Sequence, residues 1–141
     1  MLDIDYKIVR YLNKNKKRKV GEIARHFSLA HSTVGSSVKR LEEEELVIYK
    51  RYQWVELTIK GKNVAIELSR HAHLLELLLH KELGLTVDQA YQESEKFNLL
   101  FSCDTINKIC EKYHHPKICP CGVEINSTSN CLCEEDLKEH L

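Results

Sequence analysis

The sequence contains few of the residues that break helices: among its 141 residues there are two prolines and five glycines. This scarcity favours a mainly helical fold. No stretch approaches the roughly 18 uninterrupted apolar residues that span a membrane, and the first residues are too polar for a signal peptide. We therefore expect a cytoplasmic protein without a membrane partner.

Extremes of composition are absent as well. Apolar residues make up 43% and charged residues 30% of the chain, which excludes a disordered or fibrous protein. The formal net charge is zero, but residues 1–70 carry 15 basic and 9 acidic side chains, whereas residues 71–141 carry 6 and 12. A basic half joined to an acidic half is typical of a nucleic-acid-binding module attached to a partner or ligand module.

The basic half has the pattern of a helix-turn-helix. Apolar residues recur at helical spacing in residues 4–12, in 20–27, and in a third helix that begins near Ser32, its expected N-cap, and runs to Leu41. Residues 47–58 are rich in β-branched and aromatic side chains around a basic turn, which predicts a two-stranded wing. This order predicts a winged helix-turn-helix, whose third helix enters the DNA major groove.

The polar outer face of the third helix supplies the expected DNA contacts. Hydroxyl groups reach base edges or phosphates, and cationic groups neutralise phosphates. The predicted DNA-binding residues, two of them at the tip of the wing, are Thr33, Ser36, Ser37, Lys39, Arg40, Lys50 and Arg51. Two alternatives stay open: winged helices also serve as protein-binding modules, and the lysine-rich run 14–19 is also explained as a solvated loop.

The acidic half is predicted to be helical, with leucine-rich faces. A long helix runs from about Thr58 to Leu83, and shorter helices cover about 86–100 and 102–113. These faces exceed what a small domain needs for its own core, which predicts a homodimer on a palindromic duplex site. We expect a DNA-binding domain, a helical linker and dimerisation domain, and a cysteine-rich metal-binding tail at residues 1–62, 63–115 and 116–141.

All six cysteines lie in the acidic half, where a reducing compartment makes metal or redox chemistry a better explanation than structural disulfides. Two C-x-C pairs in the tail each direct both sulfurs to one side of an extended backbone. They are Cys119 with Cys121, and Cys131 with Cys133. Thiolates prefer Zn²⁺ or an iron-sulfur cluster to manganese, so the sequence predicts one of these two cofactors. An unpaired or redox-disulfide role is the alternative.

Two further sets of candidate ligands lie on predicted helices. Cys103 and Cys110, seven residues apart on one helical face, either join the tail cysteines, form a second group, or pack as small hydrophobes. His73, Glu76 and His80 share one face of the long helix at positions i, i+3 and i+7. They predict an ancillary metal site, and the alternative is the polar edge of an amphipathic helix.

Several motifs carry a resemblance to a known family. The third helix with its wing, the segment LTIKG, the dipeptide RH followed by LLE, and the segments SCDTINKI and HPKICPCG occur in this order. Together they resemble the metal-dependent repressors of the diphtheria toxin repressor and manganese transport regulator family over residues 4–122. The resemblance implies a homodimer that binds operator DNA when iron(II) or manganese(II) occupies sites at the junction of the DNA-binding and dimerisation regions.

The resemblance also implies metal ligands on the long helix. The histidine of the family's RH motif corresponds to His71, whereas counting back four residues from the acidic match, Glu76, gives Ala72. His73 is then an equally good donor. A rebuilt site at these positions would take Fe²⁺ or Mn²⁺.

The family's primary site is retained only in part. Glu95 matches one acidic ligand, and Asp5 stands for the carboxylate of the first helix. Asn98 and Leu99 occupy the positions of the family's Glu-His pair, and leucine cannot bind a metal. The resemblance therefore implies that sensing has moved from this site to the cysteines.

We expect a homodimeric winged-helix transcriptional regulator, a repressor of iron or metal homeostasis genes. Its affinity for double-stranded operator DNA would depend on a metal ion or an iron-sulfur cluster. An alternative from another class is a zinc-stabilised winged-helix module that binds protein and senses nothing. A thiol enzyme is the least favoured class, because no nucleophile-base pair or cofactor-binding loop is evident.

Overall fold

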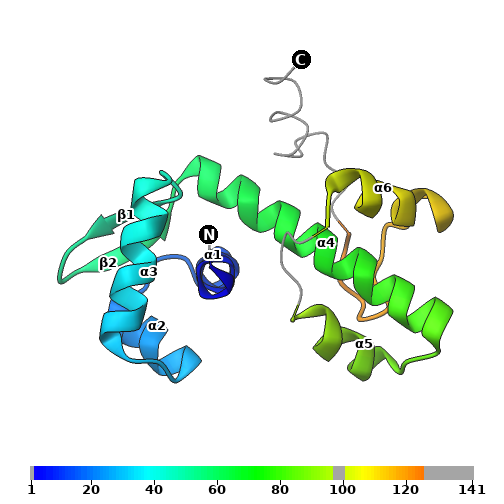
Figure 1. Cartoon of the computed structure of the whole chain (residues 1–141), viewed down its shortest axis with the longest axis horizontal. Coiled ribbons are helices and arrows are strands. Elements are labelled where there is room, and N and C mark those ends of the chain that lie inside the picture. The colour runs from blue at the N-terminus through cyan, green and yellow to red at the C-terminus, as the bar shows by residue number, and fades with distance from the viewer. Residues whose placement is uncertain (1, 97–100, 126–141) are drawn as a thin grey trace, which may run out of the picture. The chain divides into compact units, whose positions relative to one another are not determined.

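A computed structural model describes residues 2–96 and 101–125 of the chain (Figure 1). Contacts divide the chain into two compact units, Met1–Ala65 and Ile66–Leu141, with the boundary inside one long helix. Helices predominate, and the strands of the described part form one antiparallel hairpin, which confirms the predicted fold class. Among these residues, none of the helices combines the length and apolar character needed to cross a membrane.

The first unit is a winged helix-turn-helix. Its elements in chain order are α1 (Asp3–Asn15), α2 (Val20–Phe27), α3 (His31–Glu43), β1 (Val47–Lys50) and β2 (Trp54–Leu57). The strands form the wing beside α3 (Figure 1), with Val47 opposite Leu57. An isolated bridge between Arg18 and Val55 extends this hairpin to the segment before α2.

Aliphatic side chains from all three helices and the wing form the core of the first unit. On each helix they recur every three or four residues, as an amphipathic helix requires. The fully or almost fully buried members are Ile8, Val9, Leu12, Ile23, Val34, Val38, Leu41, Leu46, Val47 and Val55. The helical stripes predicted from the sequence therefore supply this core.

The N-cap of helix α3 lies two residues earlier than predicted. Ala30 is its N-cap and His31 its first residue, so the expectation that Ser32 caps this helix is wrong. Helix α2 ends at Phe27, because Ser28 adopts a left-handed conformation with φ of 54°. This conformation turns the chain tightly, so only residues 28–30 separate α2 from α3.

Asp5 on α1 is fully buried and connects α1 to α3. Its carboxylate accepts hydrogen bonds from the Ser37 hydroxyl and from Arg40 Nε (3.0 Å) and Nη2 (2.9 Å). It also accepts one from the Leu2 backbone N–H at 2.9 Å, which secures the start of α1. Burial alone would raise the pKa of Asp5, but the hydrogen bonds from Arg40 and Ser37 outweigh it and hold the pKa below its ordinary value.

Ser37 faces inward, which corrects the expectation that it lies on the outer face of α3. It is fully buried, three residues after Val34 and four before Leu41, and so belongs to the same helical stripe. Its hydroxyl is committed to Asp5. Ser37 therefore stabilises the packing of α1 against α3 and leaves the outer face to its neighbours.

Helix α4 (Ile59–Leu83) begins directly after the wing. Thr58 Oγ1 accepts a hydrogen bond from the Gly61 N–H (3.0 Å) and donates one to the Glu45 carbonyl (2.8 Å). Glycine is required at position 61, because a Cβ there would collide with the carbonyl oxygen of Leu46. The LTIKG segment thus fixes the first turn of α4 against the loop that follows α3.

In the second unit, α4 and α6 (Cys103–Lys112) share an apolar core with the segment after α6. The buried members of this core are Leu74, Leu75, Ile106, Ile109, Cys119 and Ile125. Helix α5 (Val87–Ser94) is N-capped by Thr86, whose side chain accepts a hydrogen bond from the Gln89 N–H. It ends six residues before the predicted end near Leu100, and residues 97–100 lie outside the described part.

We predict that replacing Asp5 with alanine lowers the free energy of unfolding by about 2 kcal/mol, because buried donors on α3 lose their acceptor. The pKa of Asp5 is lower in the folded chain than in the unfolded one, so this stabilisation is present above about pH 4. It is lost as the pH falls through the folded-state pKa. Urea unfolding followed by circular dichroism, repeated from about pH 3 to about pH 7, measures the loss of unfolding free energy and its pH dependence.

The matched control is Asp3→Ala. Asp3 lies on the same helix, but its side chain is 58% exposed and pairs with Lys7 at the surface. Its replacement is expected to change the unfolding free energy by no more than about 0.5 kcal/mol. Equal losses in the two variants would contradict the role assigned to Asp5.

Candidate functional site

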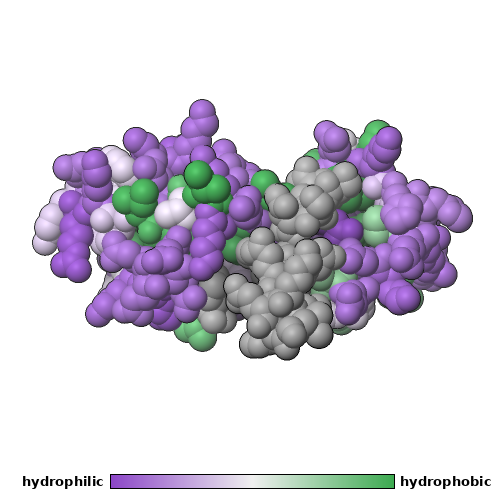
Figure 2. All heavy atoms as spheres, turned by 90° about the horizontal axis from the view of Figure 1, so that it is seen from above, coloured by the Kyte–Doolittle hydropathy of each residue, from purple (hydrophilic) through white to green (hydrophobic). Residues whose placement is uncertain are grey.

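The outer face of α3 and the wing present polar and cationic side chains. Thr33, Ser36 and Lys39 are exposed on α3, and Lys50 and Arg51 are exposed at the tip of the wing. Figure 2 shows mostly hydrophilic side chains over the first unit on the face that it draws. The structure therefore leaves five of the seven predicted DNA-binding residues at the surface, apart from Ser37 and Arg40.

Arg40 is half-buried and pairs with Asp5, its Nη2 lying 2.9 Å from the carboxylate. This hydrogen bond raises the pKa of Arg40 and partly neutralises its charge. Sequence reasoning assigned Arg40 to DNA phosphates, whereas the structure gives it a contact inside the first unit. The neighbouring Lys39 is exposed, so its ammonium group is more accessible to a phosphate than the guanidinium of Arg40.

Two lysines in and beside the wing make cation-π contacts with Trp54. The ammonium groups of Lys17 and Lys50 lie 4.3 Å and 4.9 Å from the centre of the Trp54 ring, within the range of cation-π contacts. Lys17 also lies 3.8 Å from Glu56. These contacts orient two lysines of the wing region without burying their charges.

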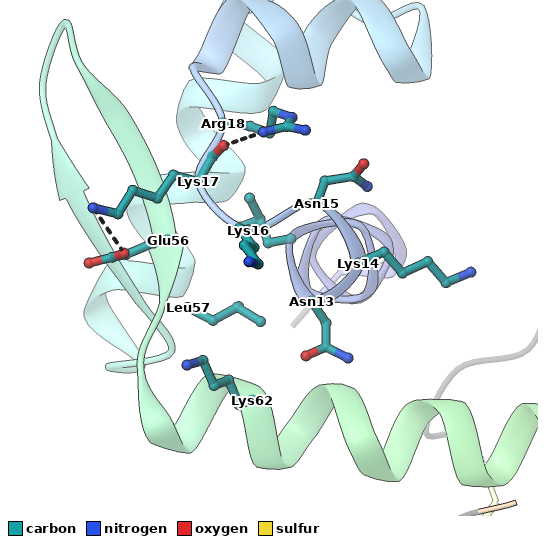
Figure 3. Close-up of a pocket in the computed structure, with 10 residues that line it drawn as sticks. Asn13, Lys14, Asn15, Lys16, Lys17, Arg18, Glu56, Leu57 and Lys62 are labelled. Carbon is teal, nitrogen blue, oxygen red and sulfur yellow. Dashed lines mark hydrogen bonds and ion pairs between the residues drawn. The ribbon is translucent and has the colours of Figure 1, made fainter. Parts of the chain in front are cut away.

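A basic cavity of about 660 Å³ lies in the first unit, where the end of α1 and the loop to α2 approach β2 and the first turn of α4 (Figure 3). Its lining residues are Leu12, Asn13, Lys14, Asn15, Lys16, Lys17, Arg18, Glu56, Leu57 and Lys62. Five of these are cationic and one is anionic, so the cavity attracts phosphate-like anions. Residues 14–18 of the lysine-rich run therefore form part of a concave surface, which the sequence alone does not reveal.

Four metal-type donors meet in the second unit and are named here the C-x-C centre: His73, Glu76, Cys119 and Cys121. Glu76 Oε2 lies 2.7 Å from Cys119 Sγ and 3.6 Å from His73 Nδ1. Cys121 Sγ lies 3.9 Å from His73 Nδ1. All four donor atoms lie within 4.8 Å of one another, close enough to bind one ion.

Two local structures bring these donors together. His73 and Glu76 are three residues apart on α4, so they share one helical face. The segment Cys119-Pro-Cys-Gly122 turns back on itself: the Gly122 N–H bonds to the Cys119 carbonyl (2.8 Å), and the Cys119 N–H to the Val123 carbonyl (2.8 Å). Gly122 has a φ of 90°, which a glycine adopts without strain. The turn directs both sulfurs toward α4.

Burial dominates the electrostatics of this centre. Cys119 and Glu76 are 2% and 1% exposed, and burial raises the pKa of the Cys119 thiol, with the hydrogen bond to Glu76 raising it further. Glu76 Oε1 is buried and has no hydrogen-bond partner in the described part of the chain. A buried acceptor without a donor is costly, and a cation at the centre would satisfy it.

The chemistry of the donors fits a zinc-type ion. Two soft sulfurs, one borderline imidazole nitrogen and one hard carboxylate oxygen make a four-ligand set of the kinds that tetrahedral Zn²⁺ accepts. Manganese prefers octahedral oxygen-rich sites, which this set does not provide. The four residues of the C-x-C centre could therefore hold a zinc-type ion.

The structure places the remaining predicted ligands elsewhere. His80 Nδ1 lies 2.8 Å from the Leu85 carbonyl, so the structure does not bring His80 to His73 and Glu76. Cys110 Sγ lies 3.4 Å from His115 Nδ1, outside both donor clusters found among residues 2–96 and 101–125. Glu95 is the half-buried C-cap of α5 and belongs to neither cluster. The predicted ligands Cys131 and Cys133 lie outside the described residues.

Of the other predicted ligands, the structure places Asp5 in the first unit and Cys103 at the start of α6. Asp5, matched by resemblance to a metal ligand, is instead bonded to α3 and belongs to neither donor cluster in the described part. Cys103 and His71 lie together with Glu67, a residue that sequence reasoning missed. The signal for Glu67 was its position four residues before His71 on one helix face. Cys103 is disulfide-bonded in this structure.

Comparisons with known proteins agree with both units. Residues 58–127 match the family described as "Iron dependent repressor, metal binding and dimerisation domain", and residues 6–49 match "Bacterial regulatory protein, arsR family". The HTH-type transcriptional regulator MntR of Bacillus subtilis (strain 168) is 28% identical over 109 residues, which cover 77% of this chain and 76% of MntR.

Solved structures are similar over most of the chain. The manganese regulator SloR has a TM-score of 0.73 and 28% identity, covering 91% of this chain and 60% of that chain. ScaR with bound Zn²⁺ has a TM-score of 0.76 and 26% identity, covering 87% of this chain and 59% of that chain. The described fold therefore corresponds to a little over half of each of these two longer chains.

The winged helix and the matched metal-binding and dimerisation domain define a class of metal-dependent transcriptional regulators, which are not enzymes. Within this class the chain belongs to the family of the diphtheria toxin repressor and the manganese transport regulator, as its motifs implied.

We predict that Cys121→Ser weakens zinc binding at the C-x-C centre by more than about 100-fold, because removing a ligand costs more than disturbing its surroundings. Competition with a chromophoric chelator, on reduced protein, measures the affinity. Cys110→Ser is the control, since Cys110 is a half-buried cysteine outside the centre. Equal affinities in the two variants would contradict the assignment of Cys121.

Proposed function

We propose that this chain is a homodimeric transcriptional regulator that binds operator DNA through its winged helix when the C-x-C centre holds a zinc-type ion. The observation that carries this proposal is the convergence of His73, Glu76, Cys119 and Cys121 within 4.8 Å. The family supports a metal-dependent repressor in general, and the donor set favours the particular ion. An iron-sulfur cluster, which the sequence also predicted, stays a prediction.

The chain's own residues supply the sensing step. His73 and Glu76 stand on α4, whereas Cys119 and Cys121 stand on the turn after α6, and all four lie beside the core that α4 shares with α6. A bound ion supplies four strong bonds between these segments. The donors then hold the turn and α4 in one arrangement, which rigidifies the dimerisation region. A rigid dimer fixes the spacing of two recognition helices on a palindromic site.

The dimer part of the proposal rests on apolar surface in the second unit. A shallow apolar cavity of about 280 Å³ is lined by Leu75, Leu78, Phe101, Ile109 and the stems of neighbouring residues. Exposed large apolar side chains of this unit include Leu83, Val87, Tyr91 and Phe101. Such surface is costly in water, and a second copy of the dimerisation domain would cover it.

The test uses the full chain, reduced and stripped of metal. Duplexes that bind it are first selected from a random-sequence library in the presence of Zn²⁺, and fluorescence anisotropy then measures affinity for a selected and a scrambled duplex. We expect Zn²⁺ to tighten binding to the selected duplex by about 10-fold or more, within the usual range of allosteric coupling. Cys121→Ser should lose this response while keeping its fold by circular dichroism.

Two outcomes would reject the proposal. One is equal affinity for selected and scrambled duplexes with and without Zn²⁺, which would favour a zinc-stabilised module that binds protein. The other is a monomer in sedimentation experiments at the concentration at which the duplex binds. Bound iron with acid-labile sulfide in protein purified without oxygen would replace the zinc-type ion by a cluster.

The electrostatic part of the proposal gives a separate prediction. Lys39→Ala should weaken binding to every duplex and reduce the slope of log affinity against log salt by about 1, as expected for one lost phosphate contact. Lys81→Ala makes the same charge change at an exposed position of the second unit and should leave the slope unchanged. Identical slopes for both variants and the wild type would argue against the assignment of α3 to DNA.

A further inference from the structure

A second cluster of donors lies between α4 and α6 and shares no residue with the C-x-C centre. It consists of Glu67 and His71 on α4 and of Cys103 at the start of α6, all within the second unit. Their exposed fractions are 1%, 1% and 3%. A carboxylate, an imidazole and a sulfur are thus buried next to one another.

The distances match a metal site. His71 Nε2 lies 3.3 Å from Glu67 Oε2, and Cys103 Sγ lies 3.7 Å from His71 Nε2 and 4.0 Å from Glu67 Oε2. With Zn–N and Zn–O bonds near 2.0–2.2 Å and a Zn–S bond near 2.3 Å, the ligand atoms of a tetrahedral zinc lie about 3.3–3.6 Å apart. Only small movements would complete the site.

A simple ion pair explains this cluster less well. Protonated His71 beside Glu67 accounts for the contact of 3.3 Å, but a buried ion pair is costly unless its remaining polar atoms are satisfied. His71 Nδ1 is buried and has no hydrogen-bond partner among the residues that the structure describes. The sulfur of Cys103 also lies close to the same two donor atoms, which places a third metal-type donor beside the pair.

We propose that Glu67, His71 and Cys103 form a second metal centre, for a zinc-type divalent ion, that joins the first turn of α6 to α4. Its three ligands leave a fourth tetrahedral position for water or another donor. The site requires the reduced chain, because a disulfide sulfur is not a thiolate ligand and Cys103 is disulfide-bonded in this structure. The two centres share no ligand, so each can be removed by a substitution that leaves the donors of the other in place.

The first experiment uses Co²⁺ as a spectroscopic substitute for Zn²⁺. In the full chain, serine replaces every cysteine except Cys103, and the protein is reduced with a phosphine and kept under nitrogen. We expect one Co²⁺ per chain with a thiolate-to-cobalt charge-transfer band. Adding Cys103→Ser should abolish the band, and His71→Gln should weaken Co²⁺ binding by more than about 10-fold.

A folded single-cysteine chain, as judged by circular dichroism, that binds Co²⁺ without this band would overturn the proposal. Because five replacements could unfold the second unit, the second experiment counts zinc in otherwise wild-type protein by elemental analysis. Reduced Cys103→Ser should hold one zinc per chain fewer than the wild type. Cys110→Ser, which changes the other cysteine of α6, should hold the wild-type number, and an unchanged number in Cys103→Ser rejects the second centre.

These readouts do not involve DNA. A loss of one zinc in Cys103→Ser supports the second centre even if no duplex binds to the protein. Conversely, zinc-dependent duplex binding with an unchanged zinc count in Cys103→Ser supports the proposed regulator and rejects this inference.

Discussion

The second unit depends on the burial of ionisable side chains along a single helix. Glu67, His71 and Glu76 on α4 are each 1% exposed, and removing such groups from water costs several kcal/mol unless partners compensate. Glu67 and His71 pair with each other, Glu76 lies beside His73, and cysteines from α6 and from the turn that follows it join both groups. Cys119 belongs both to the apolar core and to a donor cluster, so packing and ligand placement depend on the same contact.

The first unit compensates a buried carboxylate with hydrogen bonds. The buried Asp5 carboxylate is compensated entirely by donors of the same unit, Ser37 and Arg40 among them. These hydrogen bonds engage two polar residues of α3 inside the unit and fix the rotation of that helix about its axis. The remaining polar positions, such as Thr33, Ser36 and Lys39, are thereby directed to solvent as one face. A polar contact inside the unit therefore determines which residues are left for a nucleic acid.

The sequence predicted the fold class and the order of the elements, because helical periodicity and turn residues are local signals. The same periodicity places Ser37 in the buried stripe, yet its polarity favoured an outward position. The meeting of Cys119 with Glu76 joins positions 43 residues apart and has no local signal. Glu67 was missed because an isolated acidic residue on a helix ordinarily faces solvent. His80 shares a face with His73 in spacing, but the Leu85 carbonyl engages it.

The separation of the donors along the chain has a consequence for the lifetime of the protein. An ion bound by Glu76 and Cys119 closes a loop of 43 positions in the native state and has no equivalent site in the unfolded chain. A free ion concentration 100 times the dissociation constant would then add about 2.7 kcal/mol to the unfolding free energy. Proteases that capture unfolded chains would remove the metal-depleted form faster, so metal supply would govern the abundance of this protein in addition to its occupancy.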